Sequence, residues 1–376
     1  MCRDREPWAF NSGPHCSEVS QPLRLGIIGC GEVSQCIHLP TLRELPQLFE
    51  VVALCDVSRA VLDVIAGQWI GAARFMHHRE LLADAHIDAV LIANHSVDHA
   101  GTALDAIAAG KHILIEKPMC INLREADLLQ AAEAGSGLVV QVGFMRRYAP
   151  AFTEAVERVR TLRDSIMLAR VHDVIGMNSL IINSIGGAMP RSDLGDDART
   201  RVRSAMTAAI AVAIGQGAES RARAYEVLLG LGSHDFSAMR ELLGTPERVL
   251  FAAHRHRGFV LTAAVDYRHY VCQIEIALDH LPRFDTYLEV YTEREVLRVD
   301  YDTPYIRHIP AKLQITGTHG MAGITSTSRF STRRDSFALE WQSFYEDIRH
   351  RRQPKTSVAD AREDLVLFRD MVGLMQ

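Results

Sequence analysis

Residues 23–34 read LRLGIIGCGEVS, a short apolar run that leads directly into a glycine-rich turn. Helical spacing follows the turn as far as Leu45, so the stretch predicts a strand, a tight turn and a helix. Gly29 and Gly31 allow the backbone to approach a pyrophosphate, whose charge is met by the helix N-terminus. Ser34 stands where a third glycine is usual, and this pattern alone is a weak indication of dinucleotide binding.

The same alternation of elements continues through the next hundred residues. Apolar runs predict further strands at residues 51–55, 89–93, 112–115 and 138–142. Helical spacing between them predicts helices near residues 60–65, 99–109 and 124–134. Strands that are apolar on both faces and alternate with helices indicate a parallel sheet covered on both sides. We therefore expect an α/β fold that begins with a doubly wound, dinucleotide-binding domain over residues 23–143, preceded by a tail at residues 1–22.

The pattern changes in the second part of the chain, residues 144–376. A glycine- and aspartate-rich loop and alanine-rich helices come first, and alternating apolar residues after Gly244 predict antiparallel strands with one buried face. Two final helices are expected at residues 337–349 and 358–374. We interpret this part as a substrate and oligomerisation domain with an insertion at about residues 178–223, which is either a lid or an extra subunit contact.

Composition excludes several functional classes. The 376 residues are 48% hydrophobic and carry a net charge of −5, which gives no electrostatic argument for binding nucleic acid or an anionic membrane. The seven cysteines show no C-x-x-C spacing, so neither a disulfide framework nor a structural metal is expected. We therefore expect a cytoplasmic location, where thiols stay reduced. We expect no secretory signal, because the first twenty-odd residues contain no run of seven apolar residues. We expect no membrane span, because the apolar stretch at residues 208–214 is too short.

Histidine pairs do not alter the expectation that no metal is bound. His77 and His78, and His254 and His256, have no carboxylates or cysteines beside them at the spacing of metal ligands. A small, polar molecule is therefore the expected substrate.

Asp56 is the candidate that selects the dinucleotide. It lies 25 residues beyond Gly31 (56 − 31) at the end of the second predicted strand. There its carboxylate can accept hydrogen bonds from a ribose 2′-hydroxyl and would repel a 2′-phosphate, which favours NAD. Two alternatives remain open: Asp56 only caps the next helix, or Arg59 beside it tolerates NADP.

A second cluster, Glu116-Lys117-Pro118, follows the strand at residues 112–115 and so leaves the carboxyl edge of the sheet, where ligands bind. Lys117 could take a proton from a hydroxyl group as the carbon loses hydride, provided that burial and the cofactor's charge lower the pKa of the lysine. The alternative is an ordinary surface pair of glutamate and lysine.

These segments together resemble the glucose-fructose oxidoreductase/inositol dehydrogenase/MocA family. The resemblance rests on residues 23–34, Cys55-Asp56, His99, the segment 109–118 and Val142 to Tyr148. It implies a Rossmann domain followed by a second α/β domain whose open, mostly antiparallel sheet often forms subunit contacts, so a homodimer or homotetramer is expected. It also implies that Lys117 transfers the proton, that Glu116 lies near the nicotinamide ribose and that Arg147 borders the cofactor or substrate cleft.

Two motifs depart from the family pattern. The usual T-P-N-x-x-H is here Asn94-His95-Ser96-Val97-Asp98-His99, in which Asn94 can bond a cofactor and His95 is either a site residue or simply solvated. The usual D-x-x-x-H becomes Gly230 to His234, so the histidine remains without its aspartate. His234 could still act as an acid or base, because imidazole titrates near neutral pH, or it is a buried structural histidine. Asp235 points about 100° away on a helix and does not replace the carboxylate.

The sequence thus predicts an NAD(P)-dependent oxidoreductase that moves hydride between the nicotinamide and a secondary alcohol or ketone of a sugar, cyclitol or similar molecule. Lys117 and His234 are the catalytic candidates. The cofactor-binding candidates are Gly29, Gly31, Glu32, Val33, Asp56, Arg59, Asn94, His95, His99, Glu116 and Arg147. The alternatives are a redox-neutral enzyme of the same family that uses NAD to cleave a glycosidic bond, and a dinucleotide-binding regulator without catalysis.

Overall fold

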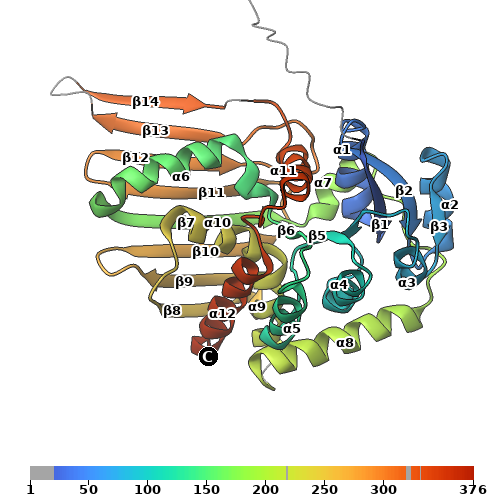
Figure 1. Cartoon of the computed structure of the whole chain (residues 1–376). Helices are drawn as coiled ribbons and strands as arrows, with labels where there is room; N and C mark the ends of the chain where they lie inside the picture. The colour runs from blue at the N-terminus through green and yellow to red at the C-terminus, as the bar shows by residue number, and fades with distance from the viewer. Residues whose placement is uncertain (1–20, 217–218, 319–322, 331) are drawn as a thin grey trace, which may run out of the picture.

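The computed structural model describes residues 21–216, 219–318, 323–330 and 332–376 (Figure 1). The strands in this part of the chain form two sheets, one of six strands and one of eight. Of the predicted tail, residues 1–22, all but the last two residues lie outside the described residues.

The first sheet is parallel throughout, in the order β3-β2-β1-β4-β5-β6. Its strands are β1 (Leu23–Ile28), β2 (Phe49–Cys55), β3 (Ala73–Phe75), β4 (Ala89–Ile92), β5 (His112–Glu116) and β6 (Val140–Gly143). This order is that of a doubly wound dinucleotide-binding fold, in which the strand order reverses between β1 and β4 and leaves a crevice at their carboxyl ends. The predicted fold of this half is confirmed; the sequence analysis omitted the short edge strand β3 and the short helix at residues 78–82.

Helices connect these strands. They are the π turn η1 (Ser34–His38), α1 (Leu39–Arg43), α2 (Arg59–Gln68), α3 (His78–Leu82), the 3₁₀ turn η2 (Ser96–Asp98), α4 (His99–Ala108) and α5 (Leu123–Glu133). The late helix α11 (Ser336–His350) also packs here, because Trp341 and Phe344 join the buried cluster of β1 and β2. The ring centroids of Trp341 and Phe49 are 5.0 Å apart. The chain therefore returns to its first sheet near its end.

The second sheet has the order β14-β13-β12-β11-β7-β10-β9-β8 and is antiparallel except where β7 pairs with β10. Its strands are β7 (Ile166–Gly176), β8 (Arg248–Arg255), β9 (Val260–Asp266), β10 (Val271–Asp279), β11 (Phe284–Thr292), β12 (Glu295–Tyr301), β13 (Lys312–Thr318) and β14 (Ile324–Arg329). The expected open, mostly antiparallel sheet is thus confirmed.

One face of this sheet is covered by helices. Figure 1 shows α6, α10 and α12 lying across it, and each contacts strands of the sheet. The helices and turns of this half are the 3₁₀ turn η3 (Met145–Tyr148), α6 (Pro150–Leu162), η4 (Arg163–Ser165), α9 (Glu219–Val227), the π turn η5 (Leu228–Gly232), α10 (Ser233–Leu243), η6 (His256–Gly258) and α12 (Val358–Leu374). Their apolar faces cover the inner side of the strands and form the larger core cluster.

The opposite face of the second sheet is polar. His172 Nδ1 lies 2.8 Å from the carboxylate of Glu275, and the Arg298 guanidinium lies 3.5 Å from the ring centroid of Tyr287. Ion pairs of this kind are stable in water, so this face is not a hydrophobic surface that a partner must cover.

The expected insertion contains two helices, α7 (Asn178–Ser184), which the sequence analysis placed in a loop, and α8 (Asp196–Ile214). Figure 1 shows α8 running past the lower ends of α4 and α5. It contacts η2 of the first half and α9 and α12 of the second. The insertion therefore lies against both halves of the molecule.

Two searches of the described residues were negative. None of their helices is both long and apolar enough to cross a membrane. Among these residues, no group of three or more His, Cys, Asp or Glu side chains is arranged to hold a metal ion.

The turn after β1 requires a glycine at position 29, and this requirement can be tested. Its φ is +99°, and a Cβ there would lie 2.4 Å from backbone atoms of Ala93 and Asn94. We expect Gly29→Ala to lower the free energy of unfolding by about 2 kcal/mol or more, from the unfavourable φ and the clash together. Urea denaturation measures this.

Gly67→Ala is the matched control. Gly67 is inside α2, and a Cβ there would meet none of the described atoms within 4 Å. Alanine should stabilise this position by up to about 1 kcal/mol, as in other exposed helix interiors. An equal, small effect of both substitutions would contradict the predicted conformation of the turn.

Candidate functional site

A large cleft lies at the carboxyl ends of β1, β2 and β4 and has a volume of about 1700 Å³. Seven of the predicted cofactor-binding residues line it: Gly29, Gly31, Glu32, Val33, Asp56, Asn94 and His95. The insertion forms the opposite wall through Arg191, Leu194, Arg201 and neighbouring residues. A lid was one of the two roles expected for the insertion, and the insertion does line this cleft.

The local geometry of the turn suits a dinucleotide. The Ser34 hydroxyl donates to the Gly29 carbonyl oxygen at 2.5 Å, so Ser34 stabilises the turn itself. The Cys30 N–H donates to Asp56 Oδ2 at 2.8 Å, which ties the turn to the end of β2. Gly31 borders the cleft, and a side chain at this position would take up space that a pyrophosphate needs. The residues present therefore fit the cofactor that the fold implies.

A second, smaller pocket of about 70 Å³ adjoins the cleft, and Val33 lines both cavities. Glu116, Lys117 and His234 line this pocket, so the structure brings the acid, the amine and the imidazole together. We call it the reaction pocket. The remaining polar lining includes Arg146, Asn178 and Tyr305, none of which was a predicted site residue.

Lys117 is held by a backbone carbonyl group. Its Nζ donates to the carbonyl oxygen of Gly230 at 2.6 Å. Gly230 lies within the π turn η5, the kind of local irregularity that often occurs at functional sites. Burial is the largest influence on the pKa of Lys117 and lowers it, the positive charge of Arg146 acts in the same direction, and the net pKa lies below the usual lysine value. The Gly230 carbonyl group thus bonds the amine without adding a negative charge.

Glu116 is positioned by a chain of buried hydrogen bonds. Trp341 Nε1–H donates to His38 Nδ1 at 3.1 Å, so the other nitrogen of His38, Nε2, carries the proton and donates to Glu116 Oε1 at 2.8 Å. Burial raises the pKa of Glu116, but the His38 hydrogen bond and the nearby positive charges outweigh it, and the net pKa is lowered. Glu116 is therefore a carboxylate at neutral pH. His38 and Trp341 carry no recognisable motif, and the sequence analysis missed both.

His234 is buried, and its Nδ1 has no hydrogen-bond partner among the described residues. Burial, together with the positive charges of Lys117 and Arg146, lowers the pKa of His234 well below its usual value. The sequence-based expectation that His234 titrates near neutral pH is therefore wrong. A neutral imidazole can still bond a substrate hydroxyl group.

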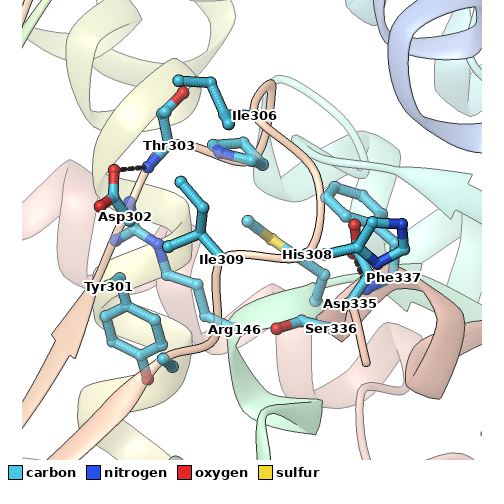
Figure 2. A pocket seen from close by; sticks show the side chains of 13 residues that line it. Arg146, Tyr301, Asp302, Thr303, Ile306, His308, Ile309, Asp335, Ser336 and Phe337 are labelled. Atoms are coloured by element: carbon cyan, nitrogen blue, oxygen red, sulfur yellow. Dashed lines mark hydrogen bonds between the residues drawn. The ribbon is translucent and has the colours of Figure 1, made fainter. Parts of the chain in front are cut away.

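Arg146 is the central charge behind the reaction pocket. Its Nη1 lies 3.0 Å from Asp173 Oδ2 and 2.5 Å from Asp235 Oδ1, and all three side chains are buried. Burial and the neighbouring Asp173 raise the pKa of Asp235 well above its usual value. Figure 2 shows the Arg146 side chain beside the ring of Tyr301, from whose centroid its guanidinium carbon is 5.2 Å away, at a small outer pocket of about 30 Å³.

Three predicted cofactor residues lie outside both cavities. Arg147 is buried between Glu241 and Asp360, so the residue that borders the pocket is its neighbour Arg146 and the expectation for Arg147 is corrected. His99 is buried below the cleft, where its Nδ1 lies 2.8 Å from the Pro118 carbonyl oxygen. Arg59 is exposed at the start of α2 and does not line the cleft.

Comparison with known proteins agrees with this geometry. Residues 23–144 match the model of the oxidoreductase family GFO_IDH_MocA, described as an NAD-binding Rossmann fold. Inositol 2-dehydrogenase 3 of Saccharopolyspora erythraea is 34% identical over 138 residues, which cover 36% of this chain and 40% of that protein. Inositol 2-dehydrogenase of Paracoccus denitrificans is 36% identical over 132 residues, 35% of this chain and 39% of that protein. The matched segment thus spans about two fifths of these curated relatives.

Solved structures extend the likeness of fold to almost the whole chain. KijD10, a 3-ketoreductase from Actinomadura kijaniata in complex with NADP and TDP-benzene, has a TM-score of 0.72 at 20% identity, covering 95% of this chain and 98% of that one. A probable dehydrogenase from Thermotoga maritima has a TM-score of 0.66 at 18% identity, covering 92% and 94%. Residues 23–144 are thus similar to the NAD-binding Rossmann domain of the GFO_IDH_MocA oxidoreductases, and the likeness of the remaining residues is one of fold.

Because Lys117 bonds the uncharged carbonyl group of Gly230, a charge introduced at this position should change the pH dependence of the rate. A Cβ at Gly230 would meet none of the described atoms within 4 Å, so an aspartate fits there. Its carboxylate beside the Lys117 ammonium would favour the charged form and raise the pKa of Lys117. If alcohol oxidation needs the neutral amine, we expect Gly230→Asp to move the rising limb of the pH–rate profile upward by about one pH unit or more.

Gly230→Asn is the control, because it adds nearly the same volume without a charge. Its pH–rate profile should keep the wild-type limb. An unshifted limb in Gly230→Asp would show that Lys117 is not the group that controls the rate.

Proposed function

We propose that this protein is an NAD(P)-dependent oxidoreductase that moves hydride between the nicotinamide and a secondary alcohol or ketone of a sugar, cyclitol or similar small polar molecule. The observation that carries the proposal is that Lys117, Glu116 and His234 line one pocket, which adjoins the dinucleotide cleft at Val33. A substrate carbon in this pocket can lie next to both the amine and the cofactor.

The side chains divide the chemistry between them. The bound dinucleotide supplies the acceptor or donor of hydride. In the oxidation direction the neutral Lys117 amine accepts the hydroxyl proton, and in the reduction direction its ammonium donates that proton to the oxygen. The ammonium also stabilises negative charge that develops on this oxygen. Neutral His234 bonds a substrate hydroxyl group and orients it, and Glu116 is placed to bond the nicotinamide ribose.

The cysteines support a cytoplasmic location as part of the same proposal. The five cysteines within the described ranges are unpaired, and four of them (Cys30, Cys55, Cys120 and Cys272) are buried. Burial raises the pKa of Cys55 to about 12, so its thiol is unreactive at neutral pH. Unpaired cysteines of this kind suit a reducing compartment.

The role of Lys117 is tested by its removal. We expect Lys117→Ala to lower turnover by roughly a hundredfold or more, because it removes both the proton carrier and the charge at the reacting oxygen. The assay follows absorbance of the reduced nicotinamide with a panel of hexoses, inositols and sugar acids. Lys312→Ala, at the exposed first residue of β13, is the control and should leave the rate unchanged.

Three outcomes would contradict the proposal. Activity of Lys117→Ala within tenfold of wild type would remove the lysine from the mechanism. Product formation without net change in NADH would indicate the redox-neutral glycoside-cleaving enzyme instead. Cofactor binding without turnover on the whole panel, unaffected by Lys117→Ala, would favour a regulator.

We also propose that the polar face of the second sheet joins copies of the chain into a homodimer or homotetramer. Its charged and aromatic side chains, such as Arg298 over Tyr287, suit a polar interface. Analytical ultracentrifugation should show oligomers that Arg298→Glu dissociates by placing like charges beside Glu289 and Asp300. Wild-type protein that sediments only as a monomer would contradict this.

A further inference from the structure

Both carboxylate oxygens of Asp56 already accept hydrogen bonds from other residues of the protein. Its Oδ1 accepts from the Ser58 N–H at 2.8 Å and from Arg191 Nε at 3.0 Å. Its Oδ2 accepts from the Cys30 N–H at 2.8 Å and from Arg191 Nη2 at 2.7 Å. A carboxylate offers about four lone-pair positions, and four donors fill them here. Asp56 therefore has no free acceptor site for a ribose 2′-hydroxyl in this arrangement.

The charged group that is exposed to the cleft beside Asp56 is instead the guanidinium of Arg191. This side chain keeps 36% of its surface exposed, whereas that of Asp56 keeps 1%. A Cβ built on Gly31 would lie 3.0 Å from Nη2 of Arg191, so the guanidinium lies directly above the glycine that a pyrophosphate approaches. The pair thus presents N–H donors and a cation at the place where the fold normally presents a bare carboxylate.

Arg191 is held in place on both sides along the chain. Two residues before it, Met189 exchanges two hydrogen bonds with the Gln35 side chain, at 2.8 and 3.3 Å. Two residues after it, Asp193 accepts from the Ser58 hydroxyl at 2.5 Å and from the Ala60 N–H at 3.2 Å. Asp193 does not line the cleft, so its negative charge anchors the segment and is not part of the cleft wall. A guanidinium held in this way loses little freedom when it binds an anion.

We propose that Arg191 of the insertion is the residue that sets the choice of cofactor, by covering Asp56 and offering its guanidinium to the 2′-phosphate of NADP. The inference rests on the proposed dinucleotide function and deepens it. It also reverses the preference for NAD that Asp56 suggests in the sequence. The 2′-phosphate gains charge-assisted hydrogen bonds from Arg191, while the repulsion from Asp56 is compensated by the ion pair.

Equilibrium binding of NADPH and NADH, followed by nicotinamide fluorescence, tests the inference on the full-length protein. Wild type should bind NADPH at least about tenfold more tightly than NADH. Arg191→Ala should lower the ratio of the two affinities by about 10- to 100-fold, since it removes hydrogen bonds to a charged group and exposes the Asp56 carboxylate. Arg191→Gln removes the charge but keeps an amide donor for Asp56, and it should lower the ratio in the same direction.

Arg201→Ala is the matched control. Arg201 lies on the same insertion and lines the same cleft, but it pairs with Asp98 at 3.0 Å, away from Asp56. Its loss should leave the ratio of affinities unchanged. Tighter binding of NADH by wild type, or an unchanged ratio in both Arg191 variants, would overturn the inference and leave the proposed oxidoreductase intact. Failure of wild type to bind either nucleotide would overturn both.

Discussion

The buried guanidinium of Arg146 is the charge on which the reaction pocket depends. It joins η3 to β7 through Asp173 and to α10 through Asp235, with all three side chains within 3% of full burial. Buried carboxylates are tolerated only when their charge is compensated, and removal of one partner of such a group typically costs about 3–5 kcal/mol. The same guanidinium helps to keep His234 neutral and lowers the pKa of Lys117. Arg146 thus both holds the elements around the pocket together and influences the protonation of Lys117 and His234.

Two π turns shape the two cavities that meet at Val33. The turn η1 follows the glycine-rich segment and carries Ser34 and His38, which fix the turn and Glu116. The turn η5 brings the Gly230 carbonyl oxygen to Lys117 and leads directly into α10, which carries His234. The main chain itself therefore supplies the hydrogen-bond acceptor for the Lys117 amine. This explains how the site can retain an oriented lysine although residue 230 has no side chain.

The features that the sequence predicted are those that depend on neighbouring residues. The glycine turn, Asp56 and Lys117 each follow a short apolar strand, and the carboxyl ends of parallel strands necessarily meet. Other features depend on distant contacts. Arg191 reaches Asp56 across 135 positions of sequence, and a backbone acceptor such as Gly230 leaves no trace in a motif. Arg146 and Arg147 are adjacent but point to different partners, and the local pattern gave no sign of which one faces the pocket. The sequence signals near Arg191 were a glycine- and aspartate-rich loop and the insertion at about residues 178–223, for which a lid was one expected role.

The proposed function requires that the Lys117 amine exchanges the proton while hydride moves. Single-turnover hydride transfer, followed as a function of pH in wild type and Lys117→Ala, tests this requirement because product release does not contribute. We expect a wild-type rate of alcohol oxidation that rises through a pKa below the usual lysine value, and a slow, pH-independent rate in Lys117→Ala. The same pH-dependent rise in both proteins would contradict it.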